Sequence, residues 1–147
     1  MKPVVSAFLL VLSMQTVAAE SPVFDALLAS AKSGNVKSQL KVGIAYDNGA
    51  GVERNLHQAA AWYRKAALNG NRDAQFNLAG VYQSGEGLPA DAIKAAVWFR
   101  VARKSGSSNA VEAEKAAFNA LSVGQQTLAI DLADRCIGTK LKNCPAE

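Results

Sequence analysis

The chain has 147 residues, of which 50% are hydrophobic and 19% charged, with a formal net charge of +4 at pH 7. This length suits one domain. Lysines and arginines are scattered along it without a dense basic stripe interleaved with aromatic residues, which argues against a nucleic-acid-binding protein.

Residues 1–19 have the pattern of a secretory signal peptide. Lys2 supplies a short basic segment, an apolar run covers residues 4–12, and small residues precede a cleavage point after Ala19. A membrane anchor is the alternative, but the apolar run is shorter than the roughly 20 residues of a spanning helix. We therefore expect a mature chain of residues 20–147, with no stable membrane insertion and a periplasmic or secreted location.

A short amphipathic helix is expected next, within residues 22–34. Phe24, Leu27, Leu28 and Ala31 recur there at helical spacing and resemble the second helix of a degenerate repeat. A terminal unit of this kind covers the apolar face that the first full repeat would otherwise expose. This segment is expected to cap the N-terminal side of the domain.

Residues 35–70 and 71–106 are two copies of one unit. Aligned without a gap, they are identical at 11 of 36 positions, where chance would give about two. The repeated residues are mostly glycine, alanine and aromatic: Tyr46/Tyr82, Gly49/Gly85, Gly51/Gly87, Ala59/Ala95, Ala60/Ala96, Trp62/Trp98, Ala66/Ala102 and Gly70/Gly106. Such self-similarity indicates a repeat architecture.

Each unit is predicted to contain two helices separated by a glycine turn. In the first helix of the first unit, Ser38, Val42 and Tyr46 recur at helical spacing. Gly49 ends this helix, because a glycine just beyond a helix end adopts the left-handed conformation that other residues resist. Small residues such as Gly43 let the paired helices approach closely, and the repeated tryptophans and tyrosines fill the space between them.

The second helix of each unit begins after an N-cap residue. Asn55 is the expected cap in the first unit, where Gln58 follows as in a capping box, and Asp91 is the expected cap in the second. Because one helical hairpin cannot bury enough apolar surface by itself, the units must stack into a continuous core. The predicted fold is all-α, an αα-hairpin repeat solenoid with about seven helices.

Residues 107–147 are expected to form a degenerate terminal unit. One helix is predicted over residues 110–121 and another over residues 123–137, capped by Ser122. The glycine turn of the two repeats is missing between these helices. The domain is therefore expected to end with this unit.

The two cysteines, Cys136 and Cys144, are expected to form a disulfide that pins the C-terminal tail to the last helix. In an exported chain, an isolated pair this close in sequence favours a disulfide over a metal site. Zinc prefers four ligands, and His57, the only histidine of the sequence, is remote from both cysteines. By loop-closure arithmetic such a bridge contributes about 2–3 kcal/mol.

The repeat pattern resembles the Sel1-like repeat family, a subgroup of the tetratricopeptide-type solenoids. The residues that carry the resemblance are Gly43-x2-Tyr46-x2-Gly49-x-Gly51-Val52 and Ala59-Ala60-x-Trp62-Tyr63-Arg64-Lys65-Ala66-Ala67-x2-Gly70. The second copy departs from the family pattern at Ala79, Val101 and Arg103. Proteins similar to this one are mostly adaptors, host-interaction factors and envelope regulators, and some are immunity proteins against toxins. The resemblance therefore implies an exported scaffold that binds a protein partner.

A second function follows from a cysteine-rich branch of the same family. That branch joins successive helices by Cys-x7-Cys pairs, which Cys136-x7-Cys144 resembles, and some of its members have been linked to penicillin binding or weak β-lactamase activity. A serine-type hydrolase or penicillin-binding protein is thus the alternative function. The two well-matched repeats depart from that branch, because they contain no cysteine.

The residues themselves contain no recognisable catalytic set, and we assign no catalytic, cofactor-binding or metal-binding residue. No serine lies in a Gly-x-Ser-x-Gly elbow. Glu112 and Glu114 are two residues apart and would point to different sides of a helix. The glycine turns at residues 49–51 and 85–87 connect helix to helix, whereas a phosphate-binding loop follows a strand. We expect a binding protein rather than an enzyme.

The candidate protein-contact surface is a polar strip on the first helices of the two units. The register that packs Val42 inward leaves Lys37 and Lys41 outward, and Asp73 and Asn77 are their equivalents in the second unit. In tetratricopeptide-type stacks the first helices line the concave face. An ordinary solvated face is the alternative interpretation, and the sequence identifies neither the partner protein nor the oligomeric state.

Overall fold

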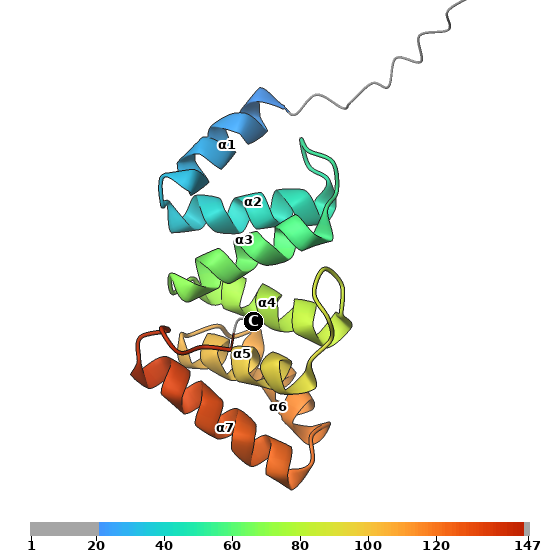
Figure 1. Ribbon diagram of the computed structural model, residues 1–147, viewed down its shortest axis with the longest axis vertical. Coiled ribbons are helices and arrows are strands. Elements are labelled where there is room, and N and C mark those ends of the chain that lie inside the picture. Colours follow the sequence, from blue (N-terminus) through green and yellow to red (C-terminus); the bar gives the residue numbers. More distant parts are fainter. Residues whose placement is uncertain (1–20, 146–147) are drawn as a thin grey trace, which may run out of the picture.

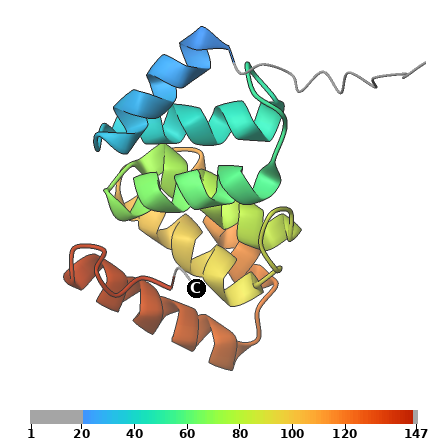
Figure 2. The same ribbon diagram turned by 45° about the horizontal axis from the view of Figure 1, so that its top comes forward.

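The computed structural model describes residues 21–145 as a stack of helices (Figures 1 and 2). Within these residues there are seven helices and no strand, so the predicted all-α fold is confirmed: α1 Pro22–Lys32, α2 Val36–Asn48, α3 Leu56–Leu68, α4 Arg72–Ser84, α5 Ala92–Lys104, α6 Ala110–Asn119 and α7 Val123–Gly138. The predicted signal peptide, residues 1–19, lies outside the described residues. Over residues 21–145 the helices are too short or too polar to cross a bilayer.

The two repeats form the two predicted hairpins. α2 packs against α3, α4 packs against α5, and α4 also packs against α3, so the hairpins stack on each other. α1 packs against α2 at the N-terminal end of the stack. Gly49 and Gly85 close α2 and α4 in the left-handed conformation, with φ of 70° and 77°, as their places in the repeat predict.

The N-cap residues of α3 and α5 are the ones predicted from the sequence, but the predicted capping box at α3 is incomplete. The side chains of Asn55 and Asp91 accept hydrogen bonds from the backbone amides of Gln58 and Lys94, at 3.1 and 2.9 Å. At α3, however, the capping box is only half formed, because Asn55 caps the helix without the reciprocal bond from a glutamine side chain. A complete capping box occurs instead at α7. There the side chain of Gln125 accepts from the backbone amide of its N-cap serine.

The helix-to-helix packing of the stack combines close backbone approach with buried amides. Tyr63 lies so close to α2 that a Cβ on Gly43 would be 2.6 Å from its ring. Gln39 and Gln75, equivalent residues of the two repeats, are buried and donate to the carbonyl oxygens of Ala31 and Ala67, at 3.3 and 3.2 Å. Each amide therefore joins a first helix to the helix before it.

The two repeated tryptophans differ in environment. Trp98 is fully buried in the main core cluster, as predicted. Trp62, expected to be equally buried, is partly exposed at the edge of the smaller cluster around Phe24. The ε-ammonium group of Lys65 lies over its ring at 5.0 Å.

The C-terminal helices are arranged differently from the two hairpins. α7 packs mainly against α5, whereas the second helix of each repeat pairs with the first helix of the same repeat. The buried residues of α7 have small side chains, which permit this close approach: they are Ala129, Ala133 and Cys136. Without the glycine turn, α6 and α7 do not fold back on each other as a repeat hairpin does.

Candidate protein-binding surface

A groove lies between the outward faces of α2 and α4, with α3 as its floor. Its volume is about 340 Å³. The groove combines apolar, small and acidic side chains from the first repeat and the start of the second: Ile44, Asp47, Asn48, Leu56, Ala59, Tyr63, Phe76, Asn77, Gly80, Val81, Ser84 and Glu86. We call it the α2–α4 groove.

A tyrosine and an aspartate form the polar centre of the α2–α4 groove. The hydroxyl of Tyr63 donates a hydrogen bond to the carboxylate of Asp47 at 2.9 Å. Burial, and then the neighbouring carboxylate, raise the pKa of Tyr63 above its usual value, so the hydroxyl stays protonated as a donor. A carboxylate has about four acceptor positions, so Asp47 can also accept hydrogen bonds from a bound partner.

The surroundings of this pair are apolar on one side and acidic at the rim. Phe76 and Ala59 line the groove, and the ring of Phe76 packs edge-on against Phe99 behind it, with centroids 5.5 Å apart. Glu86, from the glycine turn after α4, adds a second carboxylate. This combination can hold an apolar side chain and a neighbouring cationic or amide group of a polypeptide.

The predicted contact residues lie beside the groove. Lys37, Lys41 and Asp73 are exposed, and Asn77 is half-buried and lines the α2–α4 groove. Residues three and four positions apart share one face of a helix, so the predicted strip continues into the groove on both helices. Beyond the predicted residues Lys37 and Lys41, the same face of α2 carries Ile44 and Asn48. Beyond the predicted residues Asp73 and Asn77, the same face of α4 carries Gly80 and Ser84.

The sequence interpretation missed the Tyr63–Asp47 pair. Tyr63 aligns with Phe99 of the second repeat, so the repeat pattern alone indicates an apolar core position there. The available signal was a difference between the repeats: both members of the pair change in the second copy, where Phe99 and Gln83 replace them. A hydroxyl and a carboxylate that appear together in one repeat point to a bond particular to that repeat.

Other polar residues singled out from the sequence do not assemble into a reactive centre. His57 is exposed near the start of α3. Glu112 is exposed, whereas Glu114 is buried and forms ion pairs with Arg100, at 3.1 Å, and with Arg103. Within residues 21–145, no group of three or more histidine, cysteine, aspartate or glutamate side chains is placed to hold a metal ion.

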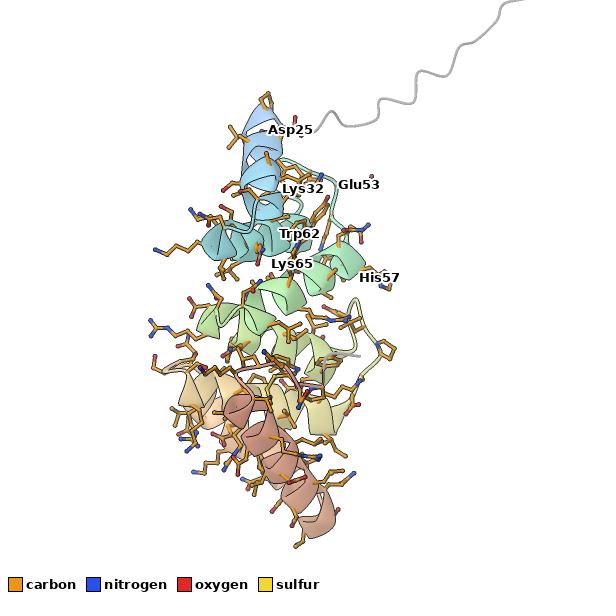
Figure 3. All side chains as sticks on the ribbon, turned by 60° about the vertical axis from the view of Figure 1, so that its left-hand side comes forward. Asp25, Lys32, Glu53, His57, Trp62 and Lys65 are labelled. Atoms are coloured by element: carbon orange, nitrogen blue, oxygen red, sulfur yellow. A yellow bond between two sulfur atoms is a disulfide. The ribbon has the colours of Figure 1, made fainter. Side chains whose placement is uncertain are left out.

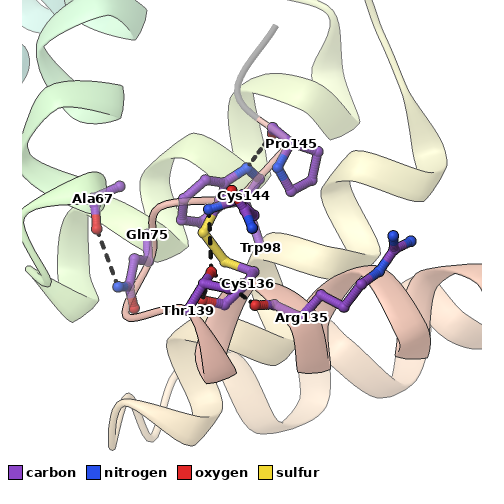
Figure 4. Close-up of a disulfide and its surroundings, with 9 residues drawn as sticks. Ala67, Gln75, Trp98, Arg135, Cys136, Thr139, Cys144 and Pro145 are labelled. Carbon is purple, nitrogen blue, oxygen red and sulfur yellow. Dashed lines mark hydrogen bonds between the residues drawn. A yellow bond between two sulfur atoms is a disulfide. The ribbon is translucent and has the colours of Figure 1, made fainter.

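The two cysteines are joined in a disulfide beside α5 (Figure 4). Cys136 is buried on α7, and Cys144 belongs to the C-terminal tail, residues 139–145. One residue further on, the carbonyl oxygen of Pro145 accepts a hydrogen bond from the indole nitrogen of Trp98 at 2.8 Å. The tail is therefore held both to α7 and to α5.

Comparison with known proteins agrees with this architecture. The Sel1 repeat family model matches residues 36–71 and 72–107. A protective antigen present in uropathogenic Escherichia coli strains, with an SLR fold, superposes with a TM-score of 0.77 at 28% identity, over 80% of this chain and 26% of the antigen. A Sel1 repeat protein from Oxalobacter formigenes superposes with a TM-score of 0.60 at 29% identity, over 60% of this chain and 67% of that protein. This chain thus spans about a quarter of the antigen's length, and no curated protein gives a match.

Proposed function

The chain is a Sel1 repeat protein, and from this we propose that it is an exported protein-interaction module whose partner binds in the α2–α4 groove. Sel1 repeats mediate protein–protein interaction. The observation that carries the proposal is the Tyr63–Asp47 pair, which holds a carboxylate in place on an apolar floor. Fixed polar groups on such a floor orient a ligand at little cost in conformational freedom.

Charge along the groove supports a polypeptide partner with a defined direction. Lys37 and Lys41 lie in the first half of α2, whereas Asp47 lies at its end and Glu86 follows the end of α4. A bound segment with basic residues near the carboxylates and acidic residues near the lysines would match this distribution. Complementary charges of this kind fix the orientation of a partner and speed its association.

Export is the second part of the proposal. The signal-peptide pattern of residues 1–19 supports it, and so does the disulfide, because such bonds persist in oxidising compartments. Mass spectrometry of the protein recovered from its source cell tests this part. A mature chain that begins at Glu20 is expected, and an intact residue 1 would contradict it.

A comparative capture experiment with charge-reversal variants tests the binding surface. The exported chain, with its disulfide intact, is immobilised and exposed to native envelope extract. We expect a saturable partner whose capture falls about tenfold in the Lys37→Glu/Lys41→Glu variant. The matched control, Lys104→Glu/Lys115→Glu, reverses two exposed charges away from the groove. Equal loss in both variants, or no loss in either, would overturn the assignment.

A further inference from the structure

The tail at Trp98 shows how this fold holds a chain segment against the second helix of a repeat. The indole nitrogen of Trp98 donates to the carbonyl oxygen of Pro145, and the disulfide holds the neighbouring Cys144 in place. Leu141 and Cys144 of the tail pack against the same core cluster as Trp98. Trp98 thereby becomes fully buried with its one polar atom satisfied.

The equivalent residue of the first repeat, Trp62, faces an open cleft. This cleft has a volume of about 530 Å³ and is lined from α1, from the end of α2, from the turn and from α3 by Leu28, Lys32, Tyr46, Val52, Glu53, Arg54, Asn55, Gln58 and Trp62. We call it the Trp62 cleft. Its Tyr46 and Val52 correspond to Tyr82 and Leu88, which belong to the Trp98 cluster or pack against it.

The charges at the Trp62 cleft differ from those at Trp98. Lys32 of α1 lines the cleft, and its counterpart one repeat length later is Leu68 of α3. Lys65 lies over the Trp62 ring where the second repeat has the buried Val101. Figure 3 shows both lysines on the same side of the molecule as Trp62. Arg54 adds a third cation and Glu53 one carboxylate, so basic groups outnumber acidic ones around the cleft.

We propose that the Trp62 cleft binds an extended acidic peptide. A backbone carbonyl of the peptide accepts the indole hydrogen of Trp62, as Pro145 does at Trp98, and a carboxylate two or so residues away pairs with Lys32 and Lys65. The aromatic and apolar walls, Tyr46 and Val52, contact the peptide's side chains. This site is separate from the α2–α4 groove and does not depend on the function proposed for it.

The proposal can be tested by NMR, because each of the two tryptophans in the sequence gives one indole N–H signal. The ¹⁵N-labelled exported chain is titrated with acetyl-Asn-Ser-Pro-Ala-Glu, which is the sequence of residues 143–147 with serine in place of Cys144 and a free C-terminus. Trp62→Phe assigns the signals, since it removes one of them. We expect the Trp62 indole signal to shift on saturation and the Trp98 signal to stay in place.

Charge variants test the acidic part of the peptide. The neutral analogue acetyl-Asn-Ser-Pro-Ala-Gln-amide should bind about tenfold more weakly, and Lys32→Glu/Lys65→Glu should weaken the acidic peptide by a similar factor. Both lysines are exposed, so this variant should keep its fold. Lys104→Glu/Lys115→Glu is the matched control, because it reverses two exposed charges away from both surfaces, and it should bind the peptide unchanged.

Three outcomes would overturn the proposal. No shift at Trp62 up to about 1 mM peptide would show that the cleft does not take such a ligand. Equal binding of the acidic and neutral peptides would remove the role of the lysines. A Trp62 shift that follows protein concentration without peptide would identify a second copy of this chain as the occupant instead.

Discussion

Tyr63 and Asp47 are joined by a hydrogen bond of 2.9 Å that connects the floor of the α2–α4 groove to the end of α2. Tyr63→Phe removes this bond and leaves the half-buried carboxylate without its donor. We expect the free energy of unfolding to fall by about 1 kcal/mol, measured by urea denaturation. Partner capture should weaken as well, because Asp47 is then free to reorient. A variant as stable as the parent, with unchanged capture, would show that the bond is incidental.

The same pair predicts how stability depends on pH. Burial first, and Asp47 second, raise the pKa of Tyr63 above its ordinary value of about 10. Folding therefore favours the protonated hydroxyl, so this contribution is complete below about pH 10 and is lost as the pH rises through the folded-state pKa. Urea denaturation between about pH 8 and 11 should show the parent losing stability more steeply than Tyr63→Phe. Parallel profiles would contradict the raised pKa.

A pair of glycines tests the close packing of α2 on α3. A Cβ at Gly43 would lie 2.6 Å from the Tyr63 ring, whereas a Cβ at Gly80 would meet no atom within 4 Å. Gly43→Ala should therefore destabilise the chain by about 1–3 kcal/mol. Gly80→Ala, the matched control in α4, should stabilise it by up to about 1 kcal/mol, because alanine favours the helix. Equal effects in thermal denaturation would show that α2 can move away from Tyr63.

The disulfide is expected to keep the tail over Trp98. Cys136→Ser/Cys144→Ser should lower the free energy of unfolding by about 2–3 kcal/mol through loop closure and expose the Trp98 indole to water. In a Trp62→Phe background Trp98 is the single tryptophan, so a red-shifted tryptophan emission reports the release of the tail. Unshifted emission would mean that the Trp98–Pro145 bond and apolar packing hold the tail without the covalent link.

Much of the fold could be predicted because the repeat specifies it twice. Gly49 and Gly85 mark the same turn in both copies, and Asn55 and Asp91 mark the same helix start, so each boundary has two independent signals. The position of α7 against α5 had no such support. It depends on which apolar faces meet in three dimensions, and the small residues Ala129 and Ala133 do not specify a partner helix.

The candidate sites were less predictable, for a related reason. Repeat alignment treats Tyr63 and Phe99 as one apolar position, and Trp62 and Trp98 as one core position. In the structure the members of each pair differ. The Tyr63 hydroxyl donates a hydrogen bond to Asp47, and of the two tryptophans only Trp98 is covered by the tail. The differences between the repeats, rather than their common pattern, thus distinguish the two surfaces proposed for binding.

Glu114 provides a last test, because it is the buried carboxylate of an ion-pair cluster between α5 and α6. Arg100 contacts it at 3.1 Å, Arg103 is also paired with it, and Arg100 reaches Asp134 of α7 at 3.7 Å. Glu114→Gln would leave two arginines facing each other without this carboxylate. Removing one partner of a buried pair costs more than the pair contributes, since the remaining charges stay desolvated.

We expect Glu114→Gln to lower the free energy of unfolding by about 3 kcal/mol. Glu112→Gln, an exposed change on the same helix, should stay within about 0.5 kcal/mol of the parent. Urea denaturation of both variants at neutral pH makes the comparison. If both changes were equally mild, water would have to replace the carboxylate around Arg100 and Arg103, and the cluster would not hold α6 to α5.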